Sequence, residues 1–474
     1  MALALSGCGV PAREQGVRPL TPGAVAADQS LPGSSAAQWP QDRWWAAYGD
    51  SQLDALVAEG LANSPDVAAA GARFRKAAAL AQQAGAALQP RVDVAAEAGL
   101  QKQSINMGYP PQFQQFLPRG WNDAGRVSAS LGFDLDLWGR NRAQLAAATS
   151  EREATAIDGQ QAALALAGGI ASAYADLDML FAARDVRASE LDAAVKWQKL
   201  LSDRQVQGLE TRGAVAQGEA RSATARAALA QADEALLLRR HQIAALVGAG
   251  PDRGLAITRP RLAAVEARGL PAGLTTELLG RRPDIVAARE RVEAAGSRIK
   301  VARADFFPAI RLDALFGVQS LGLGVLFDKD STMGSVGPAI SLPIFHGGEL
   351  RGRYRAAEAD YDLAVAGYNS TVLGAYQQTA DAWTSATLSV RRLAEARAAL
   401  NGAQEAYDVA LKRYTAGLSN YLAVLQVEDA LLDAKMNVAG LEANARAADI
   451  ALVRALGGGF VPPASANSGN PTNG

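Results

Sequence analysis

The chain contains an internal duplication, and this repeat limits how the chain can fold more than any other feature. Pro65-Asp66-Val67 and Pro283-Asp284-Ile285 each open a helical pattern, and another proline follows each opening proline 25 residues later. Six further residues recur at a constant offset of 209 positions. They are Arg204, Gly208, Leu209, Val215, Gln217 and Glu219 in the first copy, and Arg413, Gly417, Leu418, Val424, Gln426 and Glu428 in the second. Each copy is therefore predicted to contain a helix, a strand pair, a long helix, a tight turn and another helix.

The duplication divides the 474 residues into six segments. We expect residues 1–8 to be the end of a signal peptide, 9–50 an extended N-terminal segment, 51–249 and 274–457 the two repeats, 250–273 a proline-containing link, and 458–474 a disordered tail.

Apolar and polar residues alternate in four segments that follow the second proline of each copy, Pro90 and Pro308. The alternation predicts strands at residues 91–100, 126–138, 309–320 and 334–345. A half-buried sheet in water would explain each segment alone. A length of about 10 residues equally suits a strand that crosses a bilayer at a tilt.

The two longest segments between predicted turns lack proline. Residues 349–414 keep a heptad repeat, with Val365, Val372 and Leu393 among the positions spaced by seven, and residues 140–204 have the same character. Such a repeat predicts supercoiled packing against neighbouring helices. Each helix would be roughly 100 Å long at the usual rise per residue, which is an unusual length for a globular enzyme domain.

The chain lacks a run of 18 apolar residues that is free of charges and helix breakers. We therefore expect no membrane-spanning helix, and a membrane crossing would have to use the strands. Four strands cannot close a barrel, because the smallest outer-membrane barrels have about eight. In lipid, an open sheet edge would leave backbone groups unpaired, so the membrane hypothesis requires several copies of the chain to share their strands.

The composition argues against several other classes of protein. Lys and Arg total 47 against 48 for Asp and Glu, so a net charge of -1 provides no basic surface for nucleic acid. A single cysteine excludes a cysteine-built metal site, and a Gly-Lys-Ser/Thr phosphate-binding loop does not occur in the sequence. His241 and His346 are expected to be surface or packing residues. The sequence therefore supports neither enzyme activity nor a cofactor.

The single cysteine, Cys8, ends a lipobox, Leu5-Ser6-Gly7-Cys8. Small residues before the thiol admit a signal peptidase, and the thiol would accept a diacylglycerol. The following residue is Gly9 rather than an aspartate, which fits sorting to the outer membrane. A covalent lipid on Cys8 is thus the expected modification.

Six segments carry a resemblance to a known family. They are residues 44–53 (WWAAYGDSQL), 63–67 (NSPDV), 133–139 (FDLDLWG), 280–285 (GRRPDI), 338–345 (PAISLPIF) and 413–422 (RYTAGLSNYL). They resemble the signature segments of the NodT/OprM branch of the TolC family, and the resemblance runs from Cys8 to about Gly457.

The resemblance implies an α+β outer-membrane lipoprotein of a tripartite RND-type efflux pump. It would be a homotrimer with a 12-stranded β-barrel shared between protomers, a long periplasmic α-helical barrel, and an equatorial belt that includes the link. Its partners would be a periplasmic adaptor protein, an inner-membrane RND transporter and outer-membrane lipid. The duct would passively export drugs or other toxic small molecules from the periplasm to the exterior.

By position, the resemblance implies two kinds of site. The adaptor-docking tips would be the two tight turns, with Arg204, Gly208, Leu209, Arg413, Gly417 and Leu418. The periplasmic aperture would contain Leu422 and Gln426, although ordinary helix packing also explains both residues. Relatives often have an acid at the position of Gln426, so the resemblance does not carry over a cation-binding acidic ring.

Two other functions fit parts of the sequence. The exit duct of a type I protein-secretion system would have the same architecture, but the lipobox and the branch resemblance favour small-molecule efflux. A lipid-anchored periplasmic coiled-coil scaffold would explain the helices. It would not explain four lipid-compatible strands at equivalent places in both repeats.

Overall fold

The computed structural model describes residues 10–12, 16–21, 24–33, 37–106, 108, 110–264 and 268–462. The predicted lipidation site, Cys8, lies outside the described residues. Contacts divide the chain into two compact units. We call them the strand unit, Met1–Arg18, Arg75–Glu153 and Arg289–Gly367, and the helical unit, Pro19–Phe74, Ala154–Ala288 and Tyr368–Gly474. Each unit receives equivalent pieces of both repeats.

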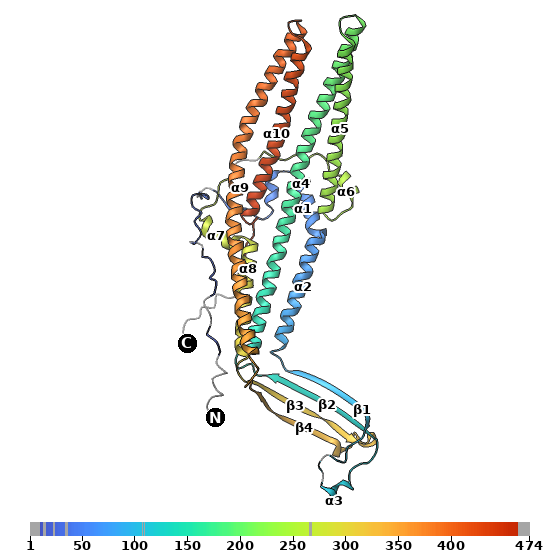
Figure 1. The fold of residues 1–474 in the computed structure, drawn as a ribbon, viewed down its shortest axis with the longest axis vertical. Helices are drawn as coiled ribbons and strands as arrows, with labels where there is room; N and C mark the ends of the chain where they lie inside the picture. The colour runs from blue at the N-terminus through green and yellow to red at the C-terminus, as the bar shows by residue number, and fades with distance from the viewer. Residues whose placement is uncertain are drawn as a thin grey trace. The chain divides into compact units, whose positions relative to one another are not determined.

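Apart from the short helices between the two strands, the order of elements is the same in the two repeats (Figure 1). The first repeat contains α1 (Ser51–Asn63), α2 (Pro65–Ala86), β1 (Arg91–Gln101), α3 (Pro111–Gln114), β2 (Asn122–Asp134), α4 (Arg140–Val206) and α5 (Arg212–Leu246). The link contains α6 (Pro251–Leu255). The second repeat contains α7 (Leu274–Arg281), α8 (Pro283–Ala304), β3 (Ala309–Leu321), η3 (Leu323–Val325), η4 (Lys329–Ser331), β4 (Thr332–Ser341), α9 (Glu349–Thr415) and α10 (Tyr421–Ala455).

Three pairs of equivalent helices have equal lengths in the two repeats, whereas the first pair, α1 with 13 residues and α7 with 8, does not. α2 and α8 each have 22 residues, α4 and α9 each have 67, and α5 and α10 each have 35. The structure therefore confirms the internal duplication, and it confirms two long helices without a break.

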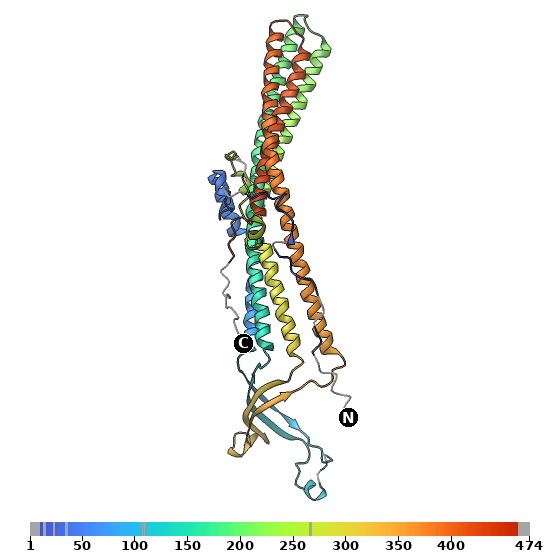
Figure 2. The ribbon, with the colours of Figure 1, turned by 90° about the vertical axis from the view of Figure 1, so that its left-hand side faces the viewer.

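In the strand unit, β1, β2, β3 and β4 form one antiparallel sheet in that order, as labelled in Figure 1; Figure 2 shows the same sheet from a second side. The register places Val94, Ala129 and Phe316 in one cross-strand row, and it places Asp93 opposite Ser130 in the next row. Successive side chains of a strand point to opposite faces. The register therefore keeps the apolar positions of neighbouring strands on one face of the sheet and the polar positions on the other, as the alternation predicted.

Two strands end earlier than predicted. The ranges 126–138 and 334–345 both run four residues past the ends of β2 and β4. After β2, Asp136 has a positive φ of 43°, and its carboxylate accepts hydrogen bonds from two backbone N–H groups at the start of α4. After β4, Pro343 has no N–H to donate to a ladder. The apolar alternation therefore continues beyond the hydrogen-bonded sheet.

Among the described residues, one helix is apolar enough over 18 residues to cross a membrane by length and composition, whereas the sequence predicted none. This helix is α4, and half of the apolar window is buried inside the protein. A long helix that packs along neighbouring helices needs such an apolar surface. The window therefore gives little support to a membrane span.

The core of the helical unit forms around the short helix η2 (Trp44–Tyr48). Trp44, Trp45 and Tyr48 are buried in one cluster with residues of α1, α4, α5 and α10. Tyr48 donates a hydrogen bond of 2.7 Å to Asp449 of α10, and Arg268 of the link donates one of 2.6 Å to the same carboxylate. The N-terminal segment and the link are thus attached to the last helix.

The predicted tail begins later than residue 458. Gly457, Gly458 and Gly459 all have positive φ values, and a Cβ on Gly457 would collide with the carbonyl oxygen of Arg281. Only glycine adopts a positive φ and lies this close to another backbone group without strain. Phe460 then packs against a small apolar cluster that includes residues of α4 and α8. The chain is therefore packed to this point, and residues 463–474 lie outside the described part.

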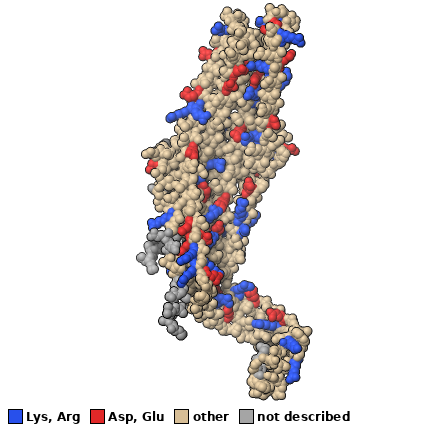
Figure 3. Space-filling model, in the orientation of Figure 1, with Lys and Arg blue, Asp and Glu red and all other residues tan. Residues whose placement is uncertain are grey.

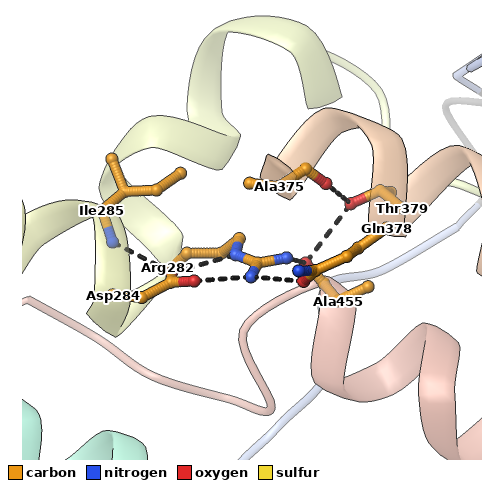
Figure 4. A network of polar contacts seen from close by, with 7 residues as sticks. All are labelled: Arg282, Asp284, Ile285, Ala375, Gln378, Thr379 and Ala455. Carbon is orange, nitrogen blue, oxygen red and sulfur yellow. Dashed lines mark hydrogen bonds and ion pairs between the residues drawn. The ribbon is translucent and has the colours of Figure 1, made fainter. Parts of the chain in front are cut away.

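A buried arginine joins three helices (Figure 4). Arg282 lies just before α8 and is 5% exposed. Its guanidinium donates two hydrogen bonds to Asp284, of 3.0 and 2.6 Å. It also donates to the carbonyl oxygen of Ala455, at 3.1 Å, and to the side chain of Gln378 in α9, at 2.8 Å. Because Ala455 ends α10, its carbonyl has no partner within that helix, and Arg282 supplies one.

We expect Arg282→Ala to destabilise the protein by about 3–5 kcal/mol, because it leaves buried polar groups without partners. Arg282→Lys should recover only part of the loss, since a lysine cannot make the forked contact. Thermal unfolding followed by circular dichroism in detergent measures both. The neighbouring Arg281, whose side chain is 38% exposed, provides the control: Arg281→Ala should cost less than about 1 kcal/mol. Equal losses for the two alanine variants would contradict this role of Arg282.

Candidate functional site

The apolar face of the sheet is exposed. Large apolar side chains stand on it in β1, β3 and β4, including Val94 at 73%, Phe316 at 70% and Val336 at 77% exposure. A sheet in water would bury this face against other elements. The exposed apolar face therefore distinguishes a membrane strand from the half-buried soluble strand that the sequence also permitted.

Exposed aromatic side chains flank both ends of the strands. Trp121 directly precedes β2 and Phe327 lies between β3 and β4, so both are at the end of the sheet opposite the helices. Trp138 follows β2 and Phe345 follows β4, at the other end. Bands of aromatic residues at the two membrane interfaces are typical of outer-membrane barrels.

Both edges of the sheet are open among the described residues. β1 pairs only with β2, and β4 pairs only with β3. In a lipid environment every backbone N–H and C=O group needs a protein partner. The sheet therefore fits a membrane wall that is completed by other strands.

The two predicted tips are matching helical turns. Gly208 and Gly417 have φ values of 69° and 73°. In each turn the residue after the glycine donates its backbone N–H to the carbonyl oxygen of the predicted arginine, Leu209 to Arg204 at 2.9 Å and Leu418 to Arg413 at 2.8 Å. This pattern is a Schellman motif at the end of a helix. The motif requires a residue with a positive φ, which explains why glycine occupies this position in both turns. The two leucines are exposed, so each turn presents an apolar side chain to the surroundings.

The predicted aperture residues lie at the start of α10. Leu422 is 56% exposed, and Gln426, one helical turn later, is also exposed. Residues four apart lie on the same side of a helix. The structure therefore brings Leu422 and Gln426 together on one exposed stripe, beside the second tip.

A group of contacts that the sequence analysis did not predict joins the two helical hairpins near these residues. Arg221 of α5 contacts Glu428 of α10 at 3.3 Å and Asp429 at 2.7 Å. Trp197 of α4 packs on Tyr421 of α10, with ring centroids 4.3 Å apart. We call these five residues the tip latch. The acids were visible in the sequence, but the position equivalent to Arg221 in the second repeat is an alanine, so the repeat comparison gave no signal for the pair.

Burial sets the electrostatics of the tip latch. Glu428 is 5% exposed, and desolvation raises the pKa of its carboxyl above the usual value although Arg221 acts in the opposite direction. Desolvation acts to lower the pKa of Arg221, but the hydrogen bond with Asp429 and the charges of Asp429 and Glu428 together outweigh it, so the pKa of Arg221 is raised. A buried charge with a single partner depends strongly on that partner.

We expect Arg221→Ala to loosen the tip latch, because Glu428 would be left buried without its partner. Backbone amides at the start of α10 should exchange with solvent on the order of tenfold faster, which hydrogen exchange with mass spectrometry measures. Lys196→Ala serves as the control. The ion pair of Lys196 with Asp192 is exposed, at 74% and 66%, and its loss should leave the exchange rates nearly unchanged. Equal rates in wild type and Arg221→Ala would rule out this role.

No group of three or more His, Cys, Asp or Glu side chains is placed to bind a metal ion within the part of the chain that the structure describes. His346 lies 3.6 Å from Glu349 at the start of α9, as a surface contact.

A lipid-facing sheet with open edges, joined to paired long helices with matching tips, defines a protomer of a membrane channel. The sequence profile described as "Outer membrane efflux protein" matches residues 56–249 and 274–458. The chain belongs to the outer membrane efflux protein family. The two matched ranges follow the two repeats and omit the link.

Curated relatives span most of the chain. The pyoverdine export outer membrane protein OpmQ of Pseudomonas putida is 30% identical over 464 residues, 97% of this chain and 96% of OpmQ. The multidrug resistance outer membrane protein MdtP of Escherichia coli is 31% identical, over 90% of this chain and 88% of MdtP. The fusaric acid resistance protein FusA of Burkholderia cepacia is 37% identical over 68% of this chain and 61% of FusA.

Solved structures agree in fold. The outer membrane protein VceC of Vibrio cholerae is 39% identical, with a TM-score of 0.82 over 89% of this chain and 100% of VceC. The outer-membrane channel OprN is 29% identical, with a TM-score of 0.82 over 95% of this chain and 99% of OprN. The family confirms the predicted TolC-like fold, the outer-membrane location and a role in efflux.

Proposed function

We propose that three copies of this chain close one 12-stranded barrel and form the exit duct of a tripartite RND-type pump. The observation that carries this proposal is the open sheet: its apolar face is exposed, and neither β1 nor β4 has a second partner among the described strands. The free edge of β4 in one copy would pair with the free edge of β1 in the next. Repeating one such interface around an axis closes a ring.

The duct would export small toxic molecules without chemical change. Among the relatives, OpmQ is named for pyoverdine export, MdtP for multidrug resistance and FusA for fusaric acid resistance. A small-molecule cargo for this chain is consistent with these names. The inner-membrane transporter would select the cargo and supply the energy.

The tips and the stripe of Leu422 and Gln426 would have separate roles. The exposed Leu209 and Leu418 offer apolar contacts to a periplasmic adaptor protein. Leu422 and Gln426 would narrow the duct, and the tip latch would hold the closed state, because opening has to separate the hairpins that it joins. Gln426 carries no charge, so this aperture would differ from an acidic ring.

We expect the purified protein to form ion channels in a planar lipid bilayer. Cys8→Ser removes the thiol that would carry the lipid, and it should leave the conductance of each channel unchanged while reducing the fraction of protein retained in outer membranes. Absence of channels from both proteins, with the fold intact by circular dichroism, would contradict the duct.

Strand sharing can be tested by cross-linking in a Cys8→Ser background. Ala95→Cys places a thiol in the middle of β1, and Ser335→Cys places one in β4. A protein with both cysteines, treated with a short bifunctional thiol reagent, should give covalent species that end at three chains on a denaturing gel. Either cysteine alone should give no ladder, because β1 would meet β4 and not another β1. A ladder ending at another number would overturn the trimer.

A further inference from the structure

The polar face of the sheet carries charges of both signs in two bands. The first band lies where the strands connect to the helices, with Arg91 and Asp93 in β1 and Arg311 and Asp313 in β3. Both arginines contact the aspartate two residues along, at 2.7 and 3.0 Å. Each arginine is therefore neutralised by the aspartate of its own strand. Figure 3 shows charged side chains of both signs on the visible face of the strand unit.

The second band lies towards the opposite end of the strands and is arranged differently. Glu97, Arg126 and Gln319 are neighbours in one cross-strand row. They line a cavity of about 750 Å³ together with Asp330 from the loop between β3 and β4. Within the described chain, neither Glu97 nor Asp330 forms an ion pair, and the buried Nε of Arg126 has no hydrogen-bond partner. These charges are therefore not neutralised in pairs.

The charged residues that line this cavity are two carboxylates and one guanidinium, a net charge of -1 per chain. Lys102 directly follows β1 and Lys329 precedes Asp330 in η4, but neither lysine lines the cavity. In a barrel the polar face of the sheet faces the lumen. A ring of such cavities would present an excess of negative charge to every solute that leaves the duct.

We propose that the row of Glu97 and Arg126, with Asp330, is a charge filter in the barrel that favours cationic over anionic solutes. This inference rests on the proposed duct, since it requires a closed barrel. The carboxylates of Glu97 and Asp330 attract cations. The guanidinium of Arg126 repels cations and so limits the preference for them over anions. In a wide, water-filled lumen, one unit charge about 7 Å from an ion changes its local concentration roughly two- to threefold. Salt screens the effect over about 10 Å at 0.1 M.

The test is the ratio of potassium to chloride permeability, obtained from the reversal potential of channels in a planar bilayer under a potassium chloride gradient. Glu97→Gln should lower the ratio, and Arg126→Gln should raise it, each by roughly two- to threefold. Glu97→Asp keeps the charge and should keep the wild-type ratio. All shifts should shrink when the salt concentration on both sides is increased tenfold.

The exchanged pair Glu97→Arg with Arg126→Glu provides the matched control. It keeps the net charge of the row, so its ratio should return close to that of wild type although both side chains have changed. Channels whose ratio is unaffected by either single change would overturn the charge filter and leave the duct standing. Shifts in the same direction for both single changes would also overturn it, because they would indicate a general distortion. A complete lack of channels in wild type would overturn the duct itself.

Discussion

The strand unit depends on one constraint: the backbone N–H and C=O groups at the outer edges of β1 and β4 need hydrogen-bond partners. The sheet has four strands and its apolar face is exposed, and within the described chain the outer edges of β1 and β4 pair with no further strand. In lipid, each unpaired amide costs several times thermal energy. In the proposed trimer, the same sequence would encode both the membrane surface and the pairing with neighbouring copies, and the assembled state would follow from the backbone rather than from a particular side chain.

In the proposed duct, the helical unit would meet a different requirement, because its long hairpins would have to stay together while their tips separate on opening. Near the core, buried polar groups such as Arg282 and Asp449 connect helices that are far apart in sequence. Towards the tips, the ion pairs between the two hairpins centre on Arg221, which contacts Glu428 and Asp429. Contacts of this kind would suit the proposed gate, which has to separate the hairpins at that end.

Much of this arrangement could be predicted from the sequence, because periodicity reports directly on which face is apolar. The duplication, the four strands and both tight turns were visible as spacings of residues. Strand ends were less predictable, since the alternation continues past β2 while the carboxylate of Asp136 already holds the start of α4. The pair of Arg221 with Glu428 could not be predicted, because it depends on how two hairpins pack and has no counterpart in the other repeat. The tail predicted from residue 458 also began too early, because the packing of Phe460 against residues of α4 and α8 is not visible in the composition of that segment.

The equal lengths of the paired helices have a consequence for how such chains can change during evolution. One inserted residue would turn everything beyond it by about 100° around the helix axis and shift it by about 1.5 Å. An insertion in α4 alone would therefore misalign its tip with that of α9, and only a compensating change in the sister copy would restore the match. The connections between strands do not need equal lengths in the two repeats. The connection between β1 and β2 has 20 residues, and the connection between β3 and β4 has 10. Length variation in this lineage should accumulate there and be nearly absent from the long helices.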